Sequence, residues 1–280
     1  MIRWYADNSD LRGIWDAAIP DILFFGGIAV DEKNRSDLCS IIQRIKSAYR
    51  AEADFPFKWN FRDLENYYQR YGLNELYQTL LAESQNWRAE IFRQIAEIDF
   101  TIIISILKCH GKDRGVLLDT HETVSRFVFS NALMRFGLFI KDLSPDRAEI
   151  ILDWPPEGQR GIFDDEYRSA FQRGTTADDL MGYYCGPLRT RGFADAALYS
   201  STRECPLLQL IDMIVGATRE MVEEALGKRE GSLGLSLIRI VRDKFRGAPK
   251  EIIGRGISLA PTRGAFYETL KVKIVDLLLT

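Results

Sequence analysis

The sequence predicts an α/β fold, in which helices flank a central sheet and further helices are inserted between its strands. Two observations support this prediction. Short, strongly apolar runs typical of buried strands occur at 21–30, 100–107 and 148–152. Segments with apolar residues at helical spacing alternate with them, at 35–51, 120–140 and 206–224. Because no internal repeat or low-complexity linker interrupts the chain, we expect a single domain.

The first two strands are expected to form an antiparallel pair. Ile2–Ala6 contains a Trp-Tyr pair that favours β structure, and it runs directly into Asp7. Residues 8–10 are Asn-Ser-Asp, which are turn-forming residues. The next run, DILFFGGIAV at 21–30, is apolar almost throughout, so we expect it to be buried on both faces of the sheet.

The middle of the chain adds helices around one further strand. A proline interrupts FPFKWN at 55–60, which places Lys58 on a loop or a short extended piece. FTIIISIL at 100–107 is rich in β-branched residues and predicts a core strand. Thr120 is suited to cap the helix that follows. The helices expected in this region are 35–51, 61–71, 73–97 and 120–140.

The last part of the chain begins with a buried strand at 148–152, which ends on Asp153. Pro206 suits the first position of the helix at 206–224, because its missing N–H would be unpaired there in any case. The other elements expected here are a helix at 163–173, a loop at 174–196, a strand at 197–201, a basic helix at 233–245 and a strand at 251–259.

Composition narrows the class of protein. Of the 280 residues, 46% are hydrophobic and 28% charged, which is ordinary for a globular protein. We expect neither a signal peptide nor a membrane helix, since the start lacks the required pattern and no apolar run approaches ~18 residues. Four scattered cysteines without a CxxC pair favour a reducing cytoplasm over a disulfide framework or a zinc site. With only two histidines, a bound metal would be held by carboxylates, which favours Mg²⁺ or Mn²⁺.

Charge is distributed unevenly along the chain. Residues 228–280 contain eleven Lys or Arg and five Asp or Glu, a surplus of six positive charges. Because the whole chain has a net charge of −3, residues 1–227 carry −9. We therefore distinguish a main domain at 1–227 from a basic C-terminal extension at 228–280 packed on it. The extension would be either a solvated helical face or a surface that contacts nucleic acid phosphates, through Arg239, Arg242, Lys244 and Arg246.

Three acidic residues occupy positions where a ligand site can form. Asp7 and Asp153 follow predicted strands, and open α/β sheets bind ligands beyond strand ends. Asp212 lies on an apolar helix face, where a carboxylate is costly unless a cation or several donors meet it. Structural roles are the alternatives: an Asx turn at Asp7, a turn cap at Asp153, and a core Asp212 bonded to an arginine or a backbone amide.

The residues around these acids resemble the bacterial domain-of-unknown-function family number 3800, which is regarded as ribonuclease H-like. That family carries Asp-Glu-Ser-Gly after its first strand, a Gly-Gly pair in its second, a Lys in the first insertion and a strand ending in Asp. The counterparts here are Asp7–Asp10, Gly26-Gly27, Lys58 and Asp153. A late Ser-Lys-x-Ser-x-Leu-Leu-Gln-Leu-Ala-Asp motif corresponds to TRECPLLQLID at 202–212. The likeness covers roughly residues 1–225, with Asn8 in place of the family's Glu and Asp10 in place of its Gly.

The resemblance implies a ribonuclease H-like mixed central sheet and a metal-dependent hydrolase. Asp7, Asp153 and Asp212 would converge to bind Mg²⁺ or Mn²⁺, and Lys58 would neutralise the scissile phosphate. Glu122 is a candidate for a fourth carboxylate, although stabilisation of the helix N-terminus is the alternative. His121 is expected to lie beside the helix cap, and Gln209 either to orient a ligand or to bond within the core.

The function expected from these residues is a metal-dependent nuclease that hydrolyses phosphodiester bonds of DNA or RNA. One alternative is a non-catalytic module that binds nucleic acid or protein, because Asn8 removes one carboxylate of the family's site. Another is a hydrolase of nucleotides or other small phosphoesters.

Overall fold

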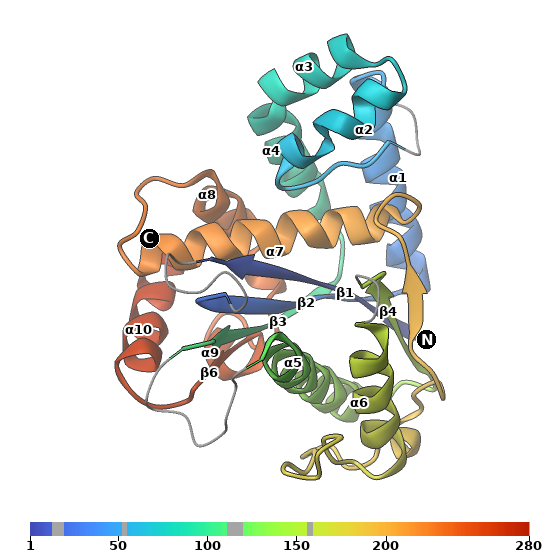
Figure 1. The fold of residues 1–280 in the computed structure, drawn as a ribbon, viewed down its shortest axis with the longest axis vertical. Coiled ribbons are helices and arrows are strands. Elements are labelled where there is room, and N and C mark those ends of the chain that lie inside the picture. Colours follow the sequence, from blue (N-terminus) through green and yellow to red (C-terminus); the bar gives the residue numbers. More distant parts are fainter. Residues whose placement is uncertain (13–19, 52–54, 111–119, 156–158, 280) are drawn as a thin grey trace.

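The computed structural model describes residues 1–12, 20–51, 55–110, 120–155 and 159–279, and shows an α/β fold (Figure 1). In these residues the sheet has six strands in the order β5-β4-β1-β2-β3-β6. β2 is antiparallel to both β1 and β3, whereas β1–β4, β4–β5 and β3–β6 are parallel pairs, so the sheet is mixed. The strands are β1 (Ile2–Leu11), β2 (Ile22–Asp31), β3 (Thr101–Lys108), β4 (Ala148–Asp153), β5 (Leu198–Ser200) and β6 (Ile257–Ala260).

Helices cover both faces of this sheet. α5 and α6 pack on one face, and α7 crosses the other together with α1, α8 and α10 (Figure 1). None of the described helices is long and apolar enough to cross a membrane. The α-helices are α1 (Glu32–Ala48), α2 (Glu65–Arg70), α3 (Asn74–Ala82), α4 (Ser84–Ile95), α5 (His121–Leu143), α6 (Arg160–Gln172), α7 (Pro206–Ala225), α8 (Leu233–Ile240), α9 (Ile252–Arg255) and α10 (Ala265–Leu279). Short 3₁₀ turns are η1 (Phe61–Leu64), η2 (Leu188–Arg191) and η3 (Arg242–Lys244).

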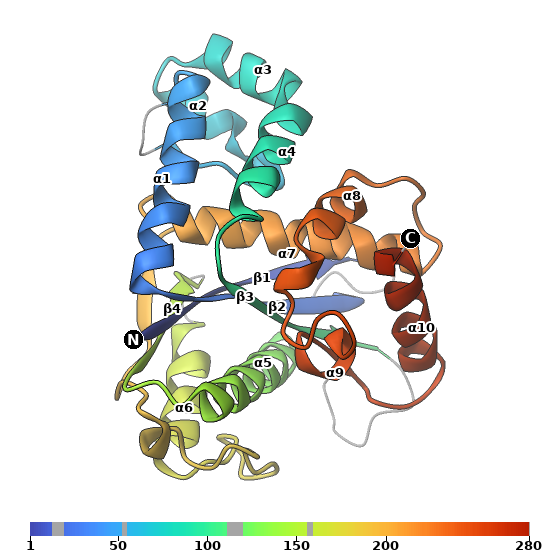
Figure 2. The same ribbon diagram turned by 180° about the vertical axis from the view of Figure 1, so that it is seen from behind.

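The helices α1 to α4 form the expected insertion between β2 and β3. They project past α7 away from the sheet in both views (Figures 1 and 2). The loop before η1 returns from this insertion to α7, where the main chain of Phe57 and Trp59 bonds to side chains of that helix. The insertion therefore brings Lys58, which lies between them, to the α7 side of the sheet.

Alternation of side chains along the strands separates two hydrophobic cores. On β1, Trp4 and Ala6 pack towards α5 and α6, whereas Tyr5 packs towards α7. On β4, Leu152 faces α5 and α6 and Ile151 faces α7. Because successive residues of a strand point to opposite faces, Asp7 after Ala6 and Asp153 after Leu152 are placed on the α7 face.

The Gly26-Gly27 pair of β2 serves the close packing of neighbouring strands. A Cβ built on Gly27 would lie 1.8 Å from the Tyr5 carbonyl oxygen, and one on Gly26 would lie 2.3 Å from the Ile103 oxygen. No side chain fits at such distances, so the backbones of β1 and β3 approach β2 in a way that only glycine permits. Gly26 is also the partner of Asp7 in the β1–β2 ladder.

The predicted turn at residues 8–10 is wrong. β1 continues through these residues to Leu11, because Asn8–Leu11 pairs with Ile22–Phe25 of β2 in an unbroken antiparallel register. Pairing with a buried strand overrides the local turn preference of Asn, Ser and Asp. The antiparallel β1–β2 pair itself, and the nearly complete burial of β2, are confirmed.

Several helix boundaries also differ from prediction. The helix expected at 73–97 is divided at Glu83, and that at 61–71 begins as a 3₁₀ turn. The basic helix expected at 233–245 ends at Ile240, and 251–259 contains α9 before β6 begins. Apolar periodicity locates helices better than it locates their ends, because ends depend on tertiary contacts. α10, for which no element was predicted, packs against α7.

Candidate functional site

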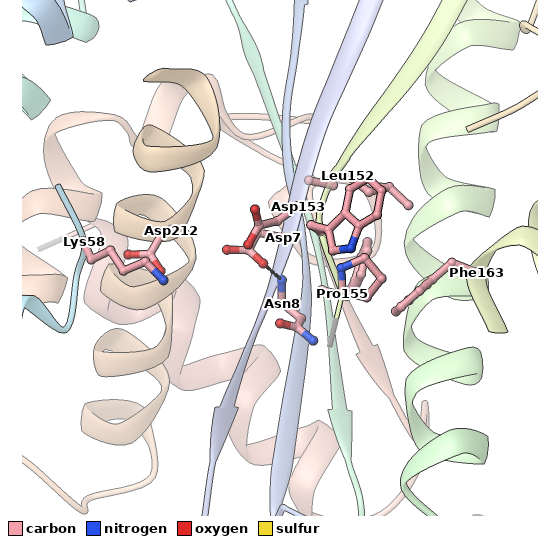
Figure 3. A pocket seen from close by; sticks show the side chains of 11 residues that line it. Asp7, Asn8, Lys58, Leu152, Asp153, Pro155, Phe163 and Asp212 are labelled. Carbon is pink, nitrogen blue, oxygen red and sulfur yellow. Dashed lines mark hydrogen bonds between the residues drawn. The ribbon is translucent and has the colours of Figure 1, made fainter. Parts of the chain in front are cut away.

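Four side chains from distant parts of the chain line one pocket of about 350 Å³ (Figure 3). Asp7 comes from β1, Asp153 from β4, Asp212 from α7 and Lys58 from the loop before η1. All four are half-buried. The structure thus brings together the four residues that the sequence singled out, although they are separated by up to 205 positions in the chain.

The register of β1 and β4 places Asp7 beside Asp153. Ala6 and Leu152 are the last pair of this parallel ladder, and the two aspartates follow immediately on their strands. Asp153 is the last residue of β4, as expected, whereas Asp7 lies inside β1 rather than at its end. Because β1 continues past the end of its ladder with β4, the pocket opens at that point.

Asp212 faces these two residues from α7 (Figure 3). Pro206 opens this helix, as predicted. Gly216, one turn after Asp212, makes room for the Trp59 ring, since a Cβ there would lie 2.2 Å from Trp59 Cγ. The space beside Gly216 is filled by the Trp59 indole, which fixes the loop that carries Lys58.

Each aspartate is oriented by one backbone amide. Asn8 N–H donates to Asp7 Oδ1 at 2.7 Å, and Thr202 N–H donates to Asp153 Oδ1 at 2.9 Å. The Trp59 N–H donates to Asp212 Oδ2. Within the described residues the second oxygen of each carboxylate receives no hydrogen bond, so it remains available to a ligand in the pocket.

The pocket perturbs the titration of two of its acids. Burial, followed by the charges of Asp153 and Asp212, raises the pKa of Asp7 well above its usual value, against the opposing effects of the Asn8 amide and Lys58. Burial also raises the pKa of Asp212, although the Trp59 amide, Lys58 and Arg219 act to lower it. Acids that share a half-buried site in this way are typical of functional centres.

Arg88 of α4 fixes the loop of Lys58 and was missed in the sequence. Its Nη2 donates to the carbonyl oxygens of Lys58, at 3.3 Å, and Trp59, and its guanidinium lies 5.0 Å from the centre of the Trp59 ring. Burial lowers the pKa of Arg88 to about 10. An Arg within an amphipathic helix carries no sequence feature that marks this role, because its partners are main-chain oxygens 29 and 30 residues away.

Gln209 connects two of the elements that position the acids and Lys58. It is fully buried, its Oε1 accepts the Phe57 N–H, and its Nε2 donates to the Thr202 carbonyl oxygen at 2.7 Å. Thr202 is the residue whose amide holds Asp153. Of the two roles considered for Gln209, bonding within the core is the one found.

Glu122 and His121 lie outside the acid pocket. The Glu122 carboxylate is exposed and forms an ion pair with Arg126 one turn later. Its position in the first turn of α5 agrees with the alternative role, which is stabilisation of the helix N-terminus. His121 lines a neighbouring pocket of about 320 Å³ that also borders Asn8, Asp212 and Arg219. The two pockets meet at Asn8 and Asp212.

The four cations of the extension that were considered as phosphate contacts all have partners within the structure. Arg239 and Arg242 donate to the carbonyl oxygens of Leu277 and Leu278, and so bind the C-terminal end of α10. Arg246 donates to the Arg135 carbonyl oxygen and pairs with Asp142, both on α5, while Lys244 lies 3.9 Å from Asp99. These four cations therefore hold the extension against α5 and α10 and lie near Asp99, whereas their contact with a phosphate stays a prediction.

The donor set of the acid pocket suits a hard divalent cation, because it consists of carboxylate oxygens. Across the described ranges, however, no group of three or more His, Cys, Asp or Glu side chains is arranged to hold an ion as it stands. The acids line one pocket without closing on one point.

Comparison with known proteins gives no relative from which a role for this pocket can be transferred: no family model, no curated protein and no solved structure matches the chain.

Proposed function

We propose that the chain is a metal-dependent hydrolase of phosphodiester bonds in nucleic acid, with its active site in the acid pocket. The observation that supports this most strongly is the gathering of Asp7, Asp153, Asp212 and Lys58 around one half-buried cavity. Three acids with one cation are well suited to hold metal ions and an anionic phosphate together.

The placement of the acids supports a ribonuclease H-like site. One acid lies on the first strand, a second ends a later strand that pairs with it in parallel, and a third lies on a late helix. This matches the arrangement implied by the family resemblance. The mixed sheet with helices on both faces is compatible with that fold.

In this proposal Asp7, Asp153 and Asp212 hold Mg²⁺ or Mn²⁺ through the oxygens that face the pocket. A divalent cation bound there lowers the pKa of a water molecule and stabilises charge on the leaving oxygen. Lys58 supplies a positive charge to the phosphate, and Arg88 and Trp59 hold the loop that presents it. The half-buried setting strengthens each of these electrostatic interactions.

A non-catalytic nucleic-acid or protein binding module is the second candidate. It is favoured by Asn8, an amide where the resembled family has a carboxylate, and by the lack of a ready-made metal group in the described residues. The two candidates differ in whether a bound phosphodiester is cleaved.

Cleavage of a mixture of labelled DNA and RNA with Mg²⁺, with Mn²⁺ and with EDTA distinguishes them. We expect metal-dependent products from the unaltered protein and from Asp37→Asn, an exposed aspartate of α1 outside the site. We expect none from Asp153→Asn. Binding without cleavage by all three proteins would support the binding module, and equal cleavage by Asp153→Asn would refute the proposed site.

A further inference from the structure

The acid pocket has two chemically different walls. Lys58 and Asp212 lie on one side, Asp7, Asn8 and Asp153 lie in the middle, and Pro155 and Phe163 lie on the other side (Figure 3). Ala6, Phe25, Leu152 and Trp154 complete the lining. The charged wall suits a phosphate, whereas the apolar wall has no role in holding a metal ion or an anion.

Trp154 is the exposed part of the apolar lining. It follows Asp153 directly, and 58% of its surface is exposed, whereas Trp59 and Phe163 in the same region are 8% and 4% exposed. Its indole does not lie loosely on the surface. The main-chain N–H of Trp154 donates to the Ser200 carbonyl oxygen at 3.0 Å, which fixes the backbone, and the Trp154 ring meets the Tyr199 ring edge-on at 5.8 Å.

Arg160 of α6 lies against the same two rings. Its guanidinium carbon is 5.5 Å from the centre of the Trp154 ring and 4.7 Å from that of Tyr199. Asp164 fixes both partners, since it accepts from Arg160 Nε at 3.1 Å and from the Tyr199 hydroxyl at 2.7 Å. An indole, a phenol and a guanidinium are thus held together at the rim of a pocket that contains phosphate-binding chemistry.

We infer that Trp154 is a stacking platform for an unpaired base, and that the substrate is single-stranded nucleic acid. This inference rests on the proposed function. A base with an accessible face can stack on the exposed indole, while the phosphate next to it reaches Lys58 and the acids. In a duplex both faces of an internal base are covered by its neighbours, so this contact is lost. Stacking of bases on aromatic side chains binds single strands with little dependence on sequence, because every base has a face that can stack.

Binding measured in EDTA tests this inference without cleavage. The probes are a labelled mixed-sequence 12-mer single strand, as DNA and as RNA, the corresponding duplexes, and an abasic strand of equal length, each followed by fluorescence anisotropy. We expect the single strands to bind more tightly than the duplexes. The abasic strand retains the phosphates, so it reports the contribution of charge alone.

Three variants isolate the stacking contact. Trp154→Ala should weaken single-strand binding about tenfold or more, and Trp154→Phe should retain most of the affinity, because phenylalanine still offers a ring. Tyr184→Ala is the matched control, since Tyr184 is an aromatic residue with 75% exposure outside the pocket lining. None of the variants should alter affinity for the abasic strand. Thermal unfolding verifies that each variant is folded.

Several results would overturn the inference. They are equal affinity of the unaltered protein for single strand and duplex, an equal loss on the abasic strand in Trp154→Ala, or a nucleoside monophosphate that binds as tightly as the 12-mer. The proposed hydrolysis fails separately, through the cleavage assay with Asp153→Asn. A protein that cleaves but does not discriminate strands would refute the platform alone, and one that binds single strands through Trp154 without cleaving would refute hydrolysis alone.

Discussion

Asp7 lies beside Asp153 because each follows the last pair of the parallel β1–β4 ladder, Ala6 and Leu152. Both side chains therefore turn to the α7 face, where Asp212 is the third acid. The arrangement costs stability, because burial and the two neighbouring carboxylates raise the pKa of Asp7 well above its usual value of 3.8. Stability given up at a cluster of like charges is characteristic of a site built for a ligand.

Replacing Asp153 with asparagine should stabilise the metal-free protein at neutral pH. One repelling charge is removed, while the amide oxygen can still accept the Thr202 N–H. We expect the free energy of unfolding to rise, because the Asp153 charge no longer opposes the ionised form of Asp7. Urea unfolding in EDTA measures this. Asp37→Asn is the control and should show no change. A large loss of stability in Asp153→Asn would instead identify Asp153 as a structural cap.

The pH dependence of the free energy of unfolding should show the same repulsion between the carboxylates. Because the pKa of Asp7 is higher in the folded than in the unfolded protein, the folded state binds more protons between the two values. Stability in EDTA should therefore fall as pH rises from the unfolded value of about 3.9 through the raised folded value. Unfolding at a series of pH values should show a shallower fall in Asp153→Asn than in the unaltered protein.

Lys58→Met should abolish most cleavage with little effect on folding. The side chain is half-buried and, within the described chain, is joined to no acid by a salt bridge, so the variant should fold, with a small loss of stability because the Lys58 charge offsets those of Asp7 and Asp212. Loss of one electrostatic contact to a reacting group costs about a hundredfold in rate or more. Lys33→Met, an exposed lysine on α1, is the matched control for cleavage rates. Equal rates in the two variants would show that Lys58 does not contact the phosphate.

The arginines of the C-terminal extension should affect stability rather than binding. Arg242 and Arg246 bind carbonyl oxygens of α10 and α5, and Arg246 also pairs with Asp142. The double change to alanine should lower the free energy of unfolding by ~2 kcal/mol, in line with lost charged hydrogen bonds. Titrations of single-stranded DNA at several salt concentrations should give an unchanged slope. A slope flatter by about two units would restore these residues as phosphate contacts.

The buried strands and the acids of the pocket could be predicted because short segments of the sequence are enough to indicate them. Apolar runs indicate the buried strands, and an acid directly after such a run is predicted to lie at the end of the strand, as Asp153 does. Asp212 is recognisable as a charge on an apolar helix face. Together with the family resemblance, the acids after apolar runs and the charge on an apolar helix face were sufficient to select residues that line one pocket.

What could not be predicted depends on contacts between distant segments. Asn8–Asp10 has the composition of a turn and becomes part of a strand only through pairing with β2. The cations of the extension are counted easily in the sequence, but their partners on α5 and α10 are not. Arg88 bonds to main-chain oxygens, which leave no trace in side-chain patterns.

Gly216→Ala should disrupt the loop that carries Lys58. A methyl group at this position would lie 2.2 Å from Trp59 Cγ, so the indole must move. Movement of Trp59 disturbs both the amide that donates to Asp212 and the carbonyl oxygen that accepts from Arg88. Overpacking of this kind costs about 1–3 kcal/mol, which exceeds the gain in helix propensity from glycine to alanine of about 1 kcal/mol.

Gly161→Ala in α6 provides the matched comparison, because none of the described residues has an atom within 4 Å of a Cβ built there. This variant should be neutral or slightly more stable in urea unfolding, since alanine favours the helix. Gly216→Ala should be less stable, and its cleavage rate should fall because Lys58 is no longer held in a fixed position relative to Asp212. If Gly216→Ala instead matched Gly161→Ala in both stability and rate, Trp59 would not be the residue that joins the loop to α7, and the position of Lys58 would need another support.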